Sequence, residues 1–275
     1  MLLSINLPKK PLKKPVLCPV SMTQSFFKNL FILTVLLIFG IFAGCQNKKT
    51  DDGFAPIFDG KSLNGWKGDS LYWRVENGFL TGEITPETIL SRNSFLVWQN
   101  GAPENFELKL EYRISQDGNS GINYRSEEIP GLPYALRGYQ FDIDGKNNYT
   151  GQNYEERRRT TLAYQGQTVV LNPLPDSLSK LPVSDLVRSN SWTEAEIIEL
   201  ADVAELRSHI KNNDWNSCHL IVNGNNMKHI LNGVLMSEVT DNDLLHGRRR
   251  GLIGVQVHVG PPMKVEFRNI RLKTL

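Results

Sequence analysis

The sequence predicts an all-β protein, an antiparallel β-sandwich of the jelly-roll kind with one short helical insertion. About a dozen short segments alternate apolar and polar residues and are separated by turn residues, which is typical of sandwiches. Two Asn-Gly pairs, Asn77-Gly78 and Asn232-Gly233, lie between such segments and favour tight hairpin turns. Only residues 193–211 combine helical spacing with a helix start signal, because Thr193 and Glu196 form a capping-box pattern there.

The first predicted strands follow residue 54. Residues 71–83 form a hairpin pattern around Asn77-Gly78, and residues 94–98 form a further short strand. The clearest strand is NFELKLEYRIS, residues 105–115, in which apolar and charged residues alternate along the whole segment. Such a strand places one face on a core and the other in water.

Residues 117–144 contain two strands around a loop that is broken by proline and glycine. Their apolar faces are predicted to join the core: Ile122 and Tyr124 in the first strand, then Tyr139, Phe141 and Ile143 in the second. Their opposite faces are polar: Gly121, Asn123 and Arg125 in the first strand, then Gln140, Asp142 and Asp144 in the second. These polar faces are either solvated surface or the floor of a cleft.

The charged run YEERRR, residues 154–159, follows by a short loop and precedes a strand at 161–171. Residues 172–190 are rich in Pro, Ser and Asp and are predicted to be irregular. The remaining strands are predicted at 217–223, 226–238, 252–259 and 264–272. Within 252–259, Gln256 and His258 again lie opposite an apolar face.

The charge distribution argues against a nucleic-acid partner. The chain has 275 residues and a formal charge of +2, but five lysines and no acid lie in residues 1–44. Without them, 26 basic residues face 29 acidic ones, a balance of −3, whereas a nucleic-acid-binding domain is normally basic. Cys218 is predicted to be a small core residue, because it alternates with Leu220 and Val222.

The N-terminus resembles a lipoprotein signal peptide. From Met22, a possible true start, one lysine precedes an apolar run of about 14 residues that ends at Ala43-Gly44-Cys45. The run is short of the roughly 20 residues that span a bilayer, so we expect cleavage and lipidation at Cys45 rather than an uncleaved membrane anchor. We therefore expect a leader and signal at 1–44, a tether at 45–53 and a single sandwich domain at 54–275. The expected location is the cell envelope, at a bacterial outer membrane.

Three segments share an uncommon pattern, in which amide, Arg, His or carboxylate groups lie opposite a good core face. If their strands are neighbours in one sheet, the polar faces combine into one patch that suits a polyhydroxylated ligand such as a small saccharide. Four tryptophans are candidate stacking platforms or, more simply, core residues: Trp66, Trp73, Trp98 and Trp215. The YEERRR run is either a charged surface loop or a cap over the end of the Asp142 strand.

Several motifs, in order, resemble the bacterial 3-keto-disaccharide hydrolase family. They are IFDGKSLNGW (57–66), WRVENGFL (73–80), NSGINYR (119–125), GYQFD (138–142), YEERRR (154–159), DWN (214–216) and VQVHVGPPMKVEFRNIRLK (255–273). The resemblance implies a concanavalin A-like lectin/glucanase sandwich that cleaves glycosides whose glucose ring carries a 3-ketone. The residues that match family motif positions are Asn119, Ser120, Gly121, Arg125, Gln140, Asp142, Tyr154, Glu156, Arg158, Arg159, Gln256 and His258.

The chemistry of a 3-keto sugar then assigns roles. The ketone acidifies the C2 proton, so a base, an oxyanion stabiliser and an acid at the leaving oxygen are needed. We expect Asp142 or His258 as base, Arg125 and Arg158 for oxyanion stabilisation, and Glu156 as acid or orienting group. Substrate-binding roles are expected for Asn119, Asn123, Arg125, Gln140, Tyr154, Arg158, Arg159 and Gln256. No cofactor is required, although a divalent cation on Asp142, Glu156 and His258 is an option. The alternatives are a non-catalytic carbohydrate-binding lipoprotein and a conventional two-carboxylate glycosidase.

Overall fold

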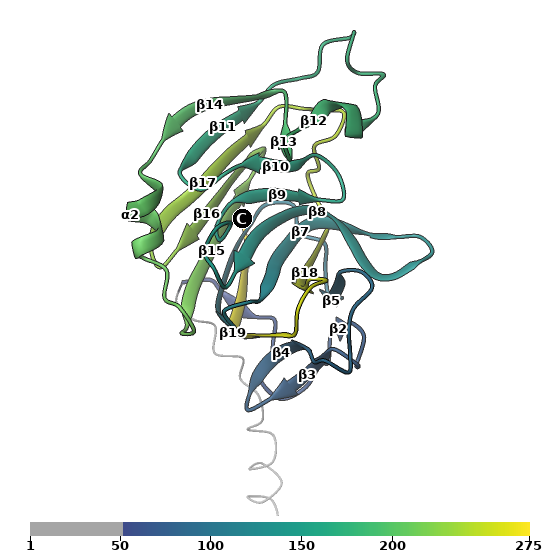
Figure 1. Cartoon of the computed structure of the whole chain (residues 1–275), viewed down its shortest axis with the longest axis vertical. Helices are drawn as coiled ribbons and strands as arrows, with labels where there is room; N and C mark the ends of the chain where they lie inside the picture. The colour runs from purple at the N-terminus through teal and green to yellow at the C-terminus, as the bar shows by residue number, and fades with distance from the viewer. Residues whose placement is uncertain (1–51) are drawn as a thin grey trace, which may run out of the picture. The chain divides into compact units, whose positions relative to one another are not determined.

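The computed structural model describes residues 52–275, which form two β-sheets packed face to face (Figure 1). The predicted leader, the lipid site at Cys45 and most of the tether lie outside the described residues. Within residues 52–275 no helix has the length and apolar character needed to cross a bilayer. The all-β prediction is confirmed, with the helical content almost confined to one short insertion.

The first sheet has ten strands, in the spatial order β14-β11-β17-β16-β15-β6-β19-β4-β3, with β1 beside β19. Its strands are β1 (Ala55–Pro56), β3 (Trp73–Glu76), β4 (Phe79–Ile84), β6 (Phe106–Ile114), β11 (Gln167–Leu171), β14 (Ala195–Leu200), β15 (Asn216–Asn223), β16 (Asn226–Leu231), β17 (Val234–Asp241) and β19 (Met263–Thr274). The predicted strands at 105–115 and 264–272 are thus its central pair, β6 and β19.

The second sheet has nine strands, in the order β12-β13-β10-β9-β8-β7-β18-β5-β2. Its strands are β2 (Trp66–Lys67), β5 (Ser94–Trp98), β7 (Asn119–Ile129), β8 (Leu132–Asp144), β9 (Asn153–Glu156), β10 (Thr160–Ala163), β12 (Val187–Arg188), β13 (Ser191–Trp192) and β18 (Leu252–Val257). A 3-10 helix, η1 (Val183–Leu186), is the only helical element in the predicted irregular stretch.

Strand pairing is antiparallel except for β10 with β13 and β11 with β17, which run parallel. The two predicted Asn-Gly turns connect β3 to β4 and β16 to β17. Asn77 and Gly78 have φ values of 53° and 83°, and Asn232 and Gly233 have values of 49° and 86°. Positive φ at both central residues is what a type I′ turn requires, and Asn and Gly adopt it most readily.

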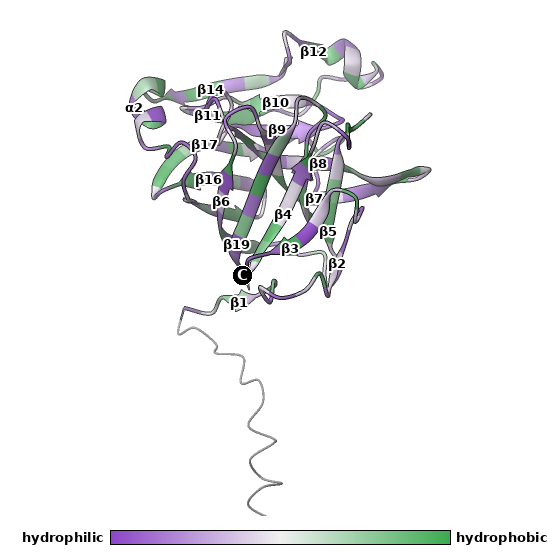
Figure 2. Ribbon diagram, turned by 60° about the horizontal axis from the view of Figure 1, so that its bottom comes forward, coloured by the Kyte–Doolittle hydropathy of each residue, from purple (hydrophilic) through white to green (hydrophobic). Residues whose placement is uncertain are grey.

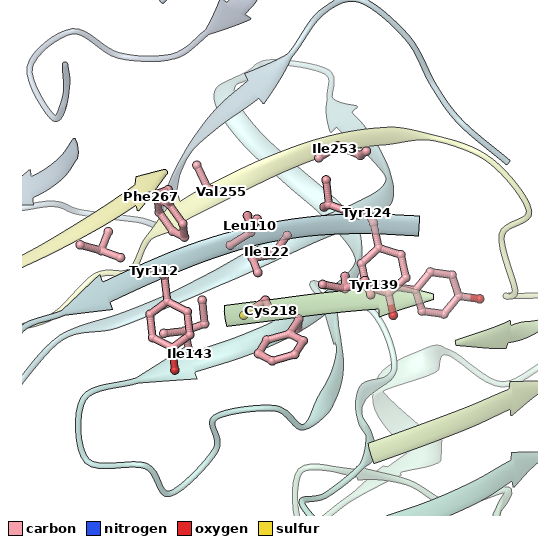
Figure 3. Packing of buried hydrophobic residues seen from close by; sticks show 14 of the residues in the cluster. Leu110, Tyr112, Ile122, Tyr124, Tyr139, Ile143, Cys218, Ile253, Val255 and Phe267 are labelled. Atoms are coloured by element: carbon pink, nitrogen blue, oxygen red, sulfur yellow. The ribbon is translucent and has the colours of Figure 1, made fainter. Parts of the chain in front are cut away.

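The core lies between the two sheets and is built from the alternating apolar positions. Leu110 and Tyr112 of β6 face Ile122 of β7 and Ile143 of β8 across the sandwich (Figure 3). Strands of both sheets are banded alternately hydrophilic and hydrophobic along their length (Figure 2). Burying each such side chain contributes about 1.5–3 kcal/mol. Cys218 is also buried in this core and is not disulfide-bonded, as predicted for a small packing residue.

The helix predicted at 193–211 is wrong over its first half. Residues Ala195–Leu200 form the edge strand β14, and the helix α2 covers only Val203–Ser208. The β-branched pair Ile197 and Ile198 favours a strand, and pairing with β11 decides the outcome. The helix starts at Asp202, whose carboxylate accepts hydrogen bonds from the first-turn N–H groups, and not at the predicted capping box.

Candidate active site

The three polar strand faces that the sequence singled out are brought together. In the second sheet β9, β8, β7 and β18 are consecutive neighbours. Their register pairs Gly121 with both Asp142 and Gln256, and Gln140 with Tyr154. Directly paired residues point to the same face of a sheet, so the polar side chains form one patch on the face that is turned away from the core.

This patch contains a cleft of about 240 Å³. Its lining residues come from β7, β8, β9, the loop after β8 and the segments that follow β12 and β18: Asn119, Gln140, Asp142, Tyr149, Gln152, Tyr154, Glu156, Asn190 and His258. Six of the eleven residues predicted to act in catalysis or substrate binding therefore line a single cleft. The cleft thus contains two carboxyl groups, an imidazole and two phenols, which are groups that can act in acid–base catalysis.

Two carboxamide side chains hold the carboxylate of Asp142 in the cleft. The Nε2 groups of Gln140 and Gln152 donate one hydrogen bond to each carboxylate oxygen. Burial raises the pKa of Asp142 to about 7, against the lowering effect of those two donors and with a further rise from the neighbouring Glu156. A carboxyl group with a pKa near 7 is well matched to proton abstraction at neutral pH.

A histidine from the opposite sheet supports this arrangement. Nδ1 of His229, on β16, lies 3.2 Å from the backbone oxygen of Gln152, and its Nε2 lies 2.9 Å from the hydroxyl of Tyr124. Burial lowers the pKa of His229 to about 3, so its ring is neutral and donates to one partner while accepting from the other. The backbone that carries Gln152 is thus fixed by a bond through the core.

Alternation along β9 separates two glutamates that are adjacent in sequence. Glu156 and Tyr154 face the cleft, whereas Glu155 is fully buried on the other side. Burial raises the pKa of Glu156, opposed by the Asn93 amide, whose Nδ2 lies 3.1 Å from Oε1, and by the charge of Arg157. Burial also raises the pKa of Tyr154 to about 12, so its hydroxyl remains a hydrogen-bond donor.

His258 borders the cleft directly after β18. Its Nδ1 lies 2.6 Å from the backbone oxygen of Val259, an acceptor, which leaves Nε2 as the unprotonated nitrogen of a neutral ring. Burial lowers the pKa of His258 and favours this neutral form. Within residues 52–275 neither the Asn119 amide nor the Tyr154 hydroxyl has a hydrogen-bond partner, so both are available to a ligand in the cleft.

The floor beneath the cleft consists of tightly packed amides. Gln256 is fully buried and its Nε2 lies 3.2 Å from Oε1 of Gln140. A Cβ on Gly121 would lie 2.4 Å from Cδ of Gln140, so only glycine allows that side chain to lie across the floor. Asn123 is buried without a protein partner for either polar atom. Gln256 and Asn123 therefore lie under the cleft and not in its lining.

Arg125 points elsewhere, because a β-bulge interrupts the alternation of β7. The pairing register shifts between Tyr124 and Glu127, and Arg125 itself has a φ of 44°. Its guanidinium is buried and binds backbone carbonyl oxygens, that of Glu104 at 2.6 Å and that of Arg248 at 3.3 Å. The structure thus gives Arg125 a structural position outside the cleft, where it cannot serve as an oxyanion stabiliser.

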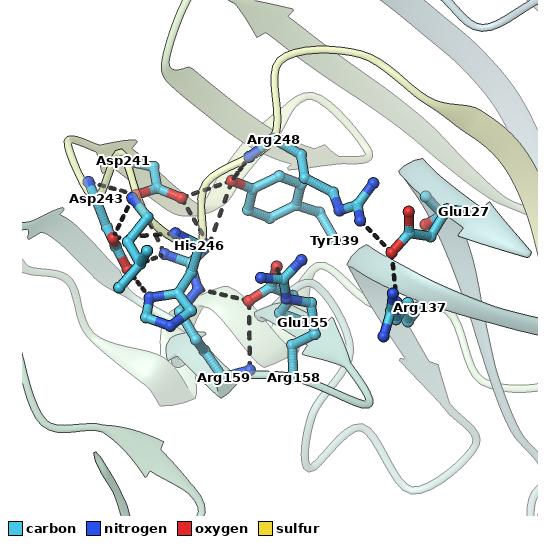
Figure 4. A network of polar contacts seen from close by, with 12 residues as sticks. Glu127, Arg137, Tyr139, Glu155, Arg158, Arg159, Asp241, Asp243, His246 and Arg248 are labelled. Carbon is cyan, nitrogen blue, oxygen red and sulfur yellow. Dashed lines mark hydrogen bonds and ion pairs between the residues drawn. The ribbon is translucent and has the colours of Figure 1, made fainter. Parts of the chain in front are cut away.

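The arginines of YEERRR also lie outside the cleft. Arg159 is fully buried and binds Glu155, Asp241 and Asp243 (Figure 4). Arg158 pairs with Glu155 at 3.6 Å, away from the cleft lining. Desolvated charges are stable only when paired in this way. The network fixes β9, from which Tyr154 and Glu156 project, so these arginines position the site and do not line it.

The suggested cation site is not preformed. Within the described part of the chain, no three His, Cys, Asp or Glu side chains converge closely enough to share one metal ion, and Asp142, Glu156 and His258 are no exception. The tryptophan platforms are absent from the cleft lining as well. Trp66, Trp73 and Trp98 are buried, and Trp215 packs on Arg268.

Sequence reasoning missed five cleft or supporting residues. They contribute to the cleft or hold it in place: Asn93, Tyr149, Gln152, Asn190 and His229. The first four lie in turns or just before strands, where no alternation marks a face. His229 alternates like a core residue, and its polar role depends on Gln152, 77 positions away in the chain.

Fold and cleft together define the class of protein: a two-sheet β-sandwich with a polar cleft on the exposed face of one sheet. The chain belongs to the family of 3-keto-alpha-glucoside-1,2-lyase-like domains, whose family model matches residues 53–273. The resemblance inferred from the sequence motifs is thereby confirmed.

The chain is also similar to individual proteins. A 3-keto-disaccharide hydrolase from Bacteroides thetaiotaomicron is 36% identical over 85 residues, which span 28% of this chain and 29% of that protein. A solved structure of a "putative glycosyl hydrolase" from Parabacteroides distasonis has a TM-score of 0.51 and 18% identity, covering 84% of this chain and 98% of that one. A second structure from the same organism has a TM-score of 0.49 and 15% identity, covering 81% and 99%. The first of these structures supports the sandwich fold.

Proposed function

We propose that the protein cleaves glycosides whose glucose ring carries a ketone at C3. The observation that carries the proposal is Asp142, a carboxyl group with a pKa of about 7 that is clamped by two carboxamides in a saccharide-sized polar cleft. The family membership and the name of the Bacteroides relative support the 3-keto substrate.

The first step assigns Asp142 as the base. Its carboxylate removes the C2 proton, and the electron pair moves into the C2–C3 bond to give an enolate at the C3 oxygen. The neutral hydroxyl of Tyr154 donates a hydrogen bond to that oxygen. This role replaces the oxyanion role expected for Arg125 and Arg158, since neither lines the cleft.

The second step expels the leaving group. The enolate reforms the ketone, a C1–C2 double bond forms, and the C1–O bond breaks. Glu156, whose raised pKa favours the protonated acid, supplies the proton to the departing oxygen. His258, neutral with a free Nε2, then removes a proton from the water that adds at C1, and Asp142 returns its proton to C2. The proton on His258 passes through solvent to Glu156, which restores both groups for the next turnover. The net reaction is hydrolysis.

Product analysis tests the proposal. The protein is incubated with 3-keto-trehalose and, separately, with plain trehalose, each with and without a chelator. Release of 3-keto-glucose or its 1,2-ene product from the oxidised substrate alone is expected. Release from plain trehalose would instead indicate a two-carboxylate glycosidase using Asp142 and Glu156. Saturable binding without any release would indicate a carbohydrate-binding module.

Variants assign the roles. We expect Asp142→Asn and Glu156→Gln each to lower kcat by about 10²–10⁴-fold, the usual contribution of a positioned acid or base. Asp176→Asn, at an exposed carboxylate outside the cleft lining, is the matched control and is expected to retain full activity. Unchanged turnover by Asp142→Asn would exclude Asp142 as the base.

We further propose that the protein is anchored in the cell envelope by a lipid on Cys45. The support is the signal-like sequence that ends at Ala43-Gly44-Cys45 and the polar tether after it. Labelling cells with a fatty-acid analogue is expected to mark the wild-type protein and not Cys45→Ser. Equal labelling of both proteins would exclude Cys45 as the lipid site.

A further inference from the structure

We infer that a second hollow beside the cleft is the subsite for the leaving group of the glycoside, and that it takes a sugar ring. This inference rests on the proposed function for its chemistry, but it stands on geometry of its own. The second hollow has a volume of about 270 Å³ and is formed by the turn at 116–119, the loop at 144–149 and the segment 258–263.

The two hollows are contiguous. Asn119, Tyr149 and His258 line both of them, and these three residues therefore form the boundary between the hollows. Each hollow alone is smaller than the roughly 300 Å³ at the lower end of small-molecule sites, whereas the two together fall within that range. One ring in each hollow accounts for a ligand of two rings, with its linking bond at the shared boundary.

The boundary is where the scissile bond must lie. Asp142, Tyr154 and Glu156 line the cleft and not the second hollow, so the ring that undergoes chemistry occupies the cleft. Everything beyond the C1 oxygen then extends past His258 into the second hollow. The groups there suit a second ring with hydroxyls: a solvent-facing ion pair between Asp117 and Lys146 at 3.1 Å supplies acceptors and donors.

Tyr149 is the residue that we expect to determine specificity. The residue is 48% exposed at the boundary, although its backbone is hydrogen-bonded on both sides. The Asp144 carboxylate accepts hydrogen bonds from the N–H groups of Tyr149 and Thr150, both at 2.9 Å, and the N–H of Gln152 donates to the carbonyl of Tyr149. An exposed aromatic ring on a fixed backbone can pack against the apolar face of a sugar with little loss of conformational freedom.

The loop is also held from its far side. Nε2 of Gln165 lies 2.7 Å from the carbonyl oxygen of Thr150, and the guanidinium of Arg207, on α2, lies 3.1 Å from that of Asn148. The helical insertion thus supports the loop that carries Tyr149. Asp144 and α2 therefore contribute to substrate selection by positioning Tyr149, although neither takes part in the chemical step.

The test compares two substrates that differ only beyond the C1 oxygen. 3-Keto-trehalose has a sugar leaving group, and methyl 3-keto-α-glucoside has one too small to reach the second hollow. Tyr149→Ala is expected to lower kcat/KM for the disaccharide about tenfold, mainly through KM, and to lower it by a clearly smaller factor for the methyl glycoside, which can contact Tyr149 only from the cleft. The control is Tyr134→Ala, on the β7–β8 hairpin and in neither hollow, which should change neither value.

Equal losses on both substrates, or no loss on either, would overturn the inference. A binding measurement separates this outcome from failure of the proposed function. Calorimetric titration with unoxidised trehalose requires no turnover, and it is expected to show weaker binding to Tyr149→Ala than to the wild type or to Tyr134→Ala. Equal binding to all three proteins, or none to the wild type, would refute the subsite even if the 3-keto reaction is confirmed.

Discussion

Replacing Asp142 with asparagine is expected to stabilise the protein at alkaline pH while it removes activity. Burial raises the pKa of Asp142 from 3.8 to about 7. Between those values the folded protein holds a proton that the unfolded chain has lost. Because the native state binds more protons in that window, its stability falls as pH rises from about 4 to about 7. An asparagine at this position carries no charge, so the variant does not lose stability as the pH rises through this range.

The size of the effect follows from the shift. A difference of about three pH units corresponds to at most about 4 kcal/mol above pH 7, of which roughly 2–3 kcal/mol accrues between pH 5 and pH 8. The cost of rearranging hydrogen bonds around the new amide is independent of pH and cancels in that comparison. Gln152 can turn to present its Oε1, which has no protein partner, to the new NH₂ group.

Urea denaturation of the wild type, Asp142→Asn and Asp176→Asn at pH 5 and pH 8 measures the effect. The free energy of unfolding of Asp142→Asn, relative to wild type, should rise by roughly 2–3 kcal/mol from pH 5 to pH 8. The exposed control should stay within about 0.5 kcal/mol of wild type at both pH values. If the relative stability of Asp142→Asn is the same at both, the raised pKa is refuted.

Three further outcomes are expected. Because Asp142 must be ionised to act as base, kcat/KM should fall about tenfold for each pH unit below about 7, and a flat profile between pH 5 and 7 would exclude it as the base. Gly121→Ala should displace Gln140 and destabilise the fold by about 1–3 kcal/mol with loss of kcat; full activity would show that the floor can relax. Arg159→Met should remove the cation that three buried carboxylates share and cost about 3–5 kcal/mol in urea denaturation, whereas a loss below about 1 kcal/mol would show that the network is not structural.

Sequence patterns predicted most of the sandwich because its strands alternate regularly. Gln140 and Asp142 were placed on one outward face of β8 by period-two reasoning alone, and the structure has them there. The same reasoning failed at Arg125, where a bulge with positive φ breaks the period. A left-handed arginine depends on the chain packed around it, so no local pattern predicts it.

Local propensity also misled where tertiary pairing decides the structure. Residues 193–200 combine a capping-box pattern with helical spacing, but pairing with β11 makes them a strand. Similarly, the run of three arginines gave no sign that Arg159 would be buried, since its partners Asp241 and Asp243 follow more than 80 positions later. Contacts of that range are not encoded in the spacing of neighbouring residues.

The bond from His229 to the backbone of Gln152 has a consequence for how activity arises during folding. It joins the two sheets through residues 77 positions apart, so this support of the Gln152 backbone forms only when the sheets have docked. Sandwiches with many such distant contacts fold in milliseconds to seconds, much more slowly than helical proteins. After dilution from denaturant, full catalysis is therefore expected to return with docking of the sheets and not with strand formation alone.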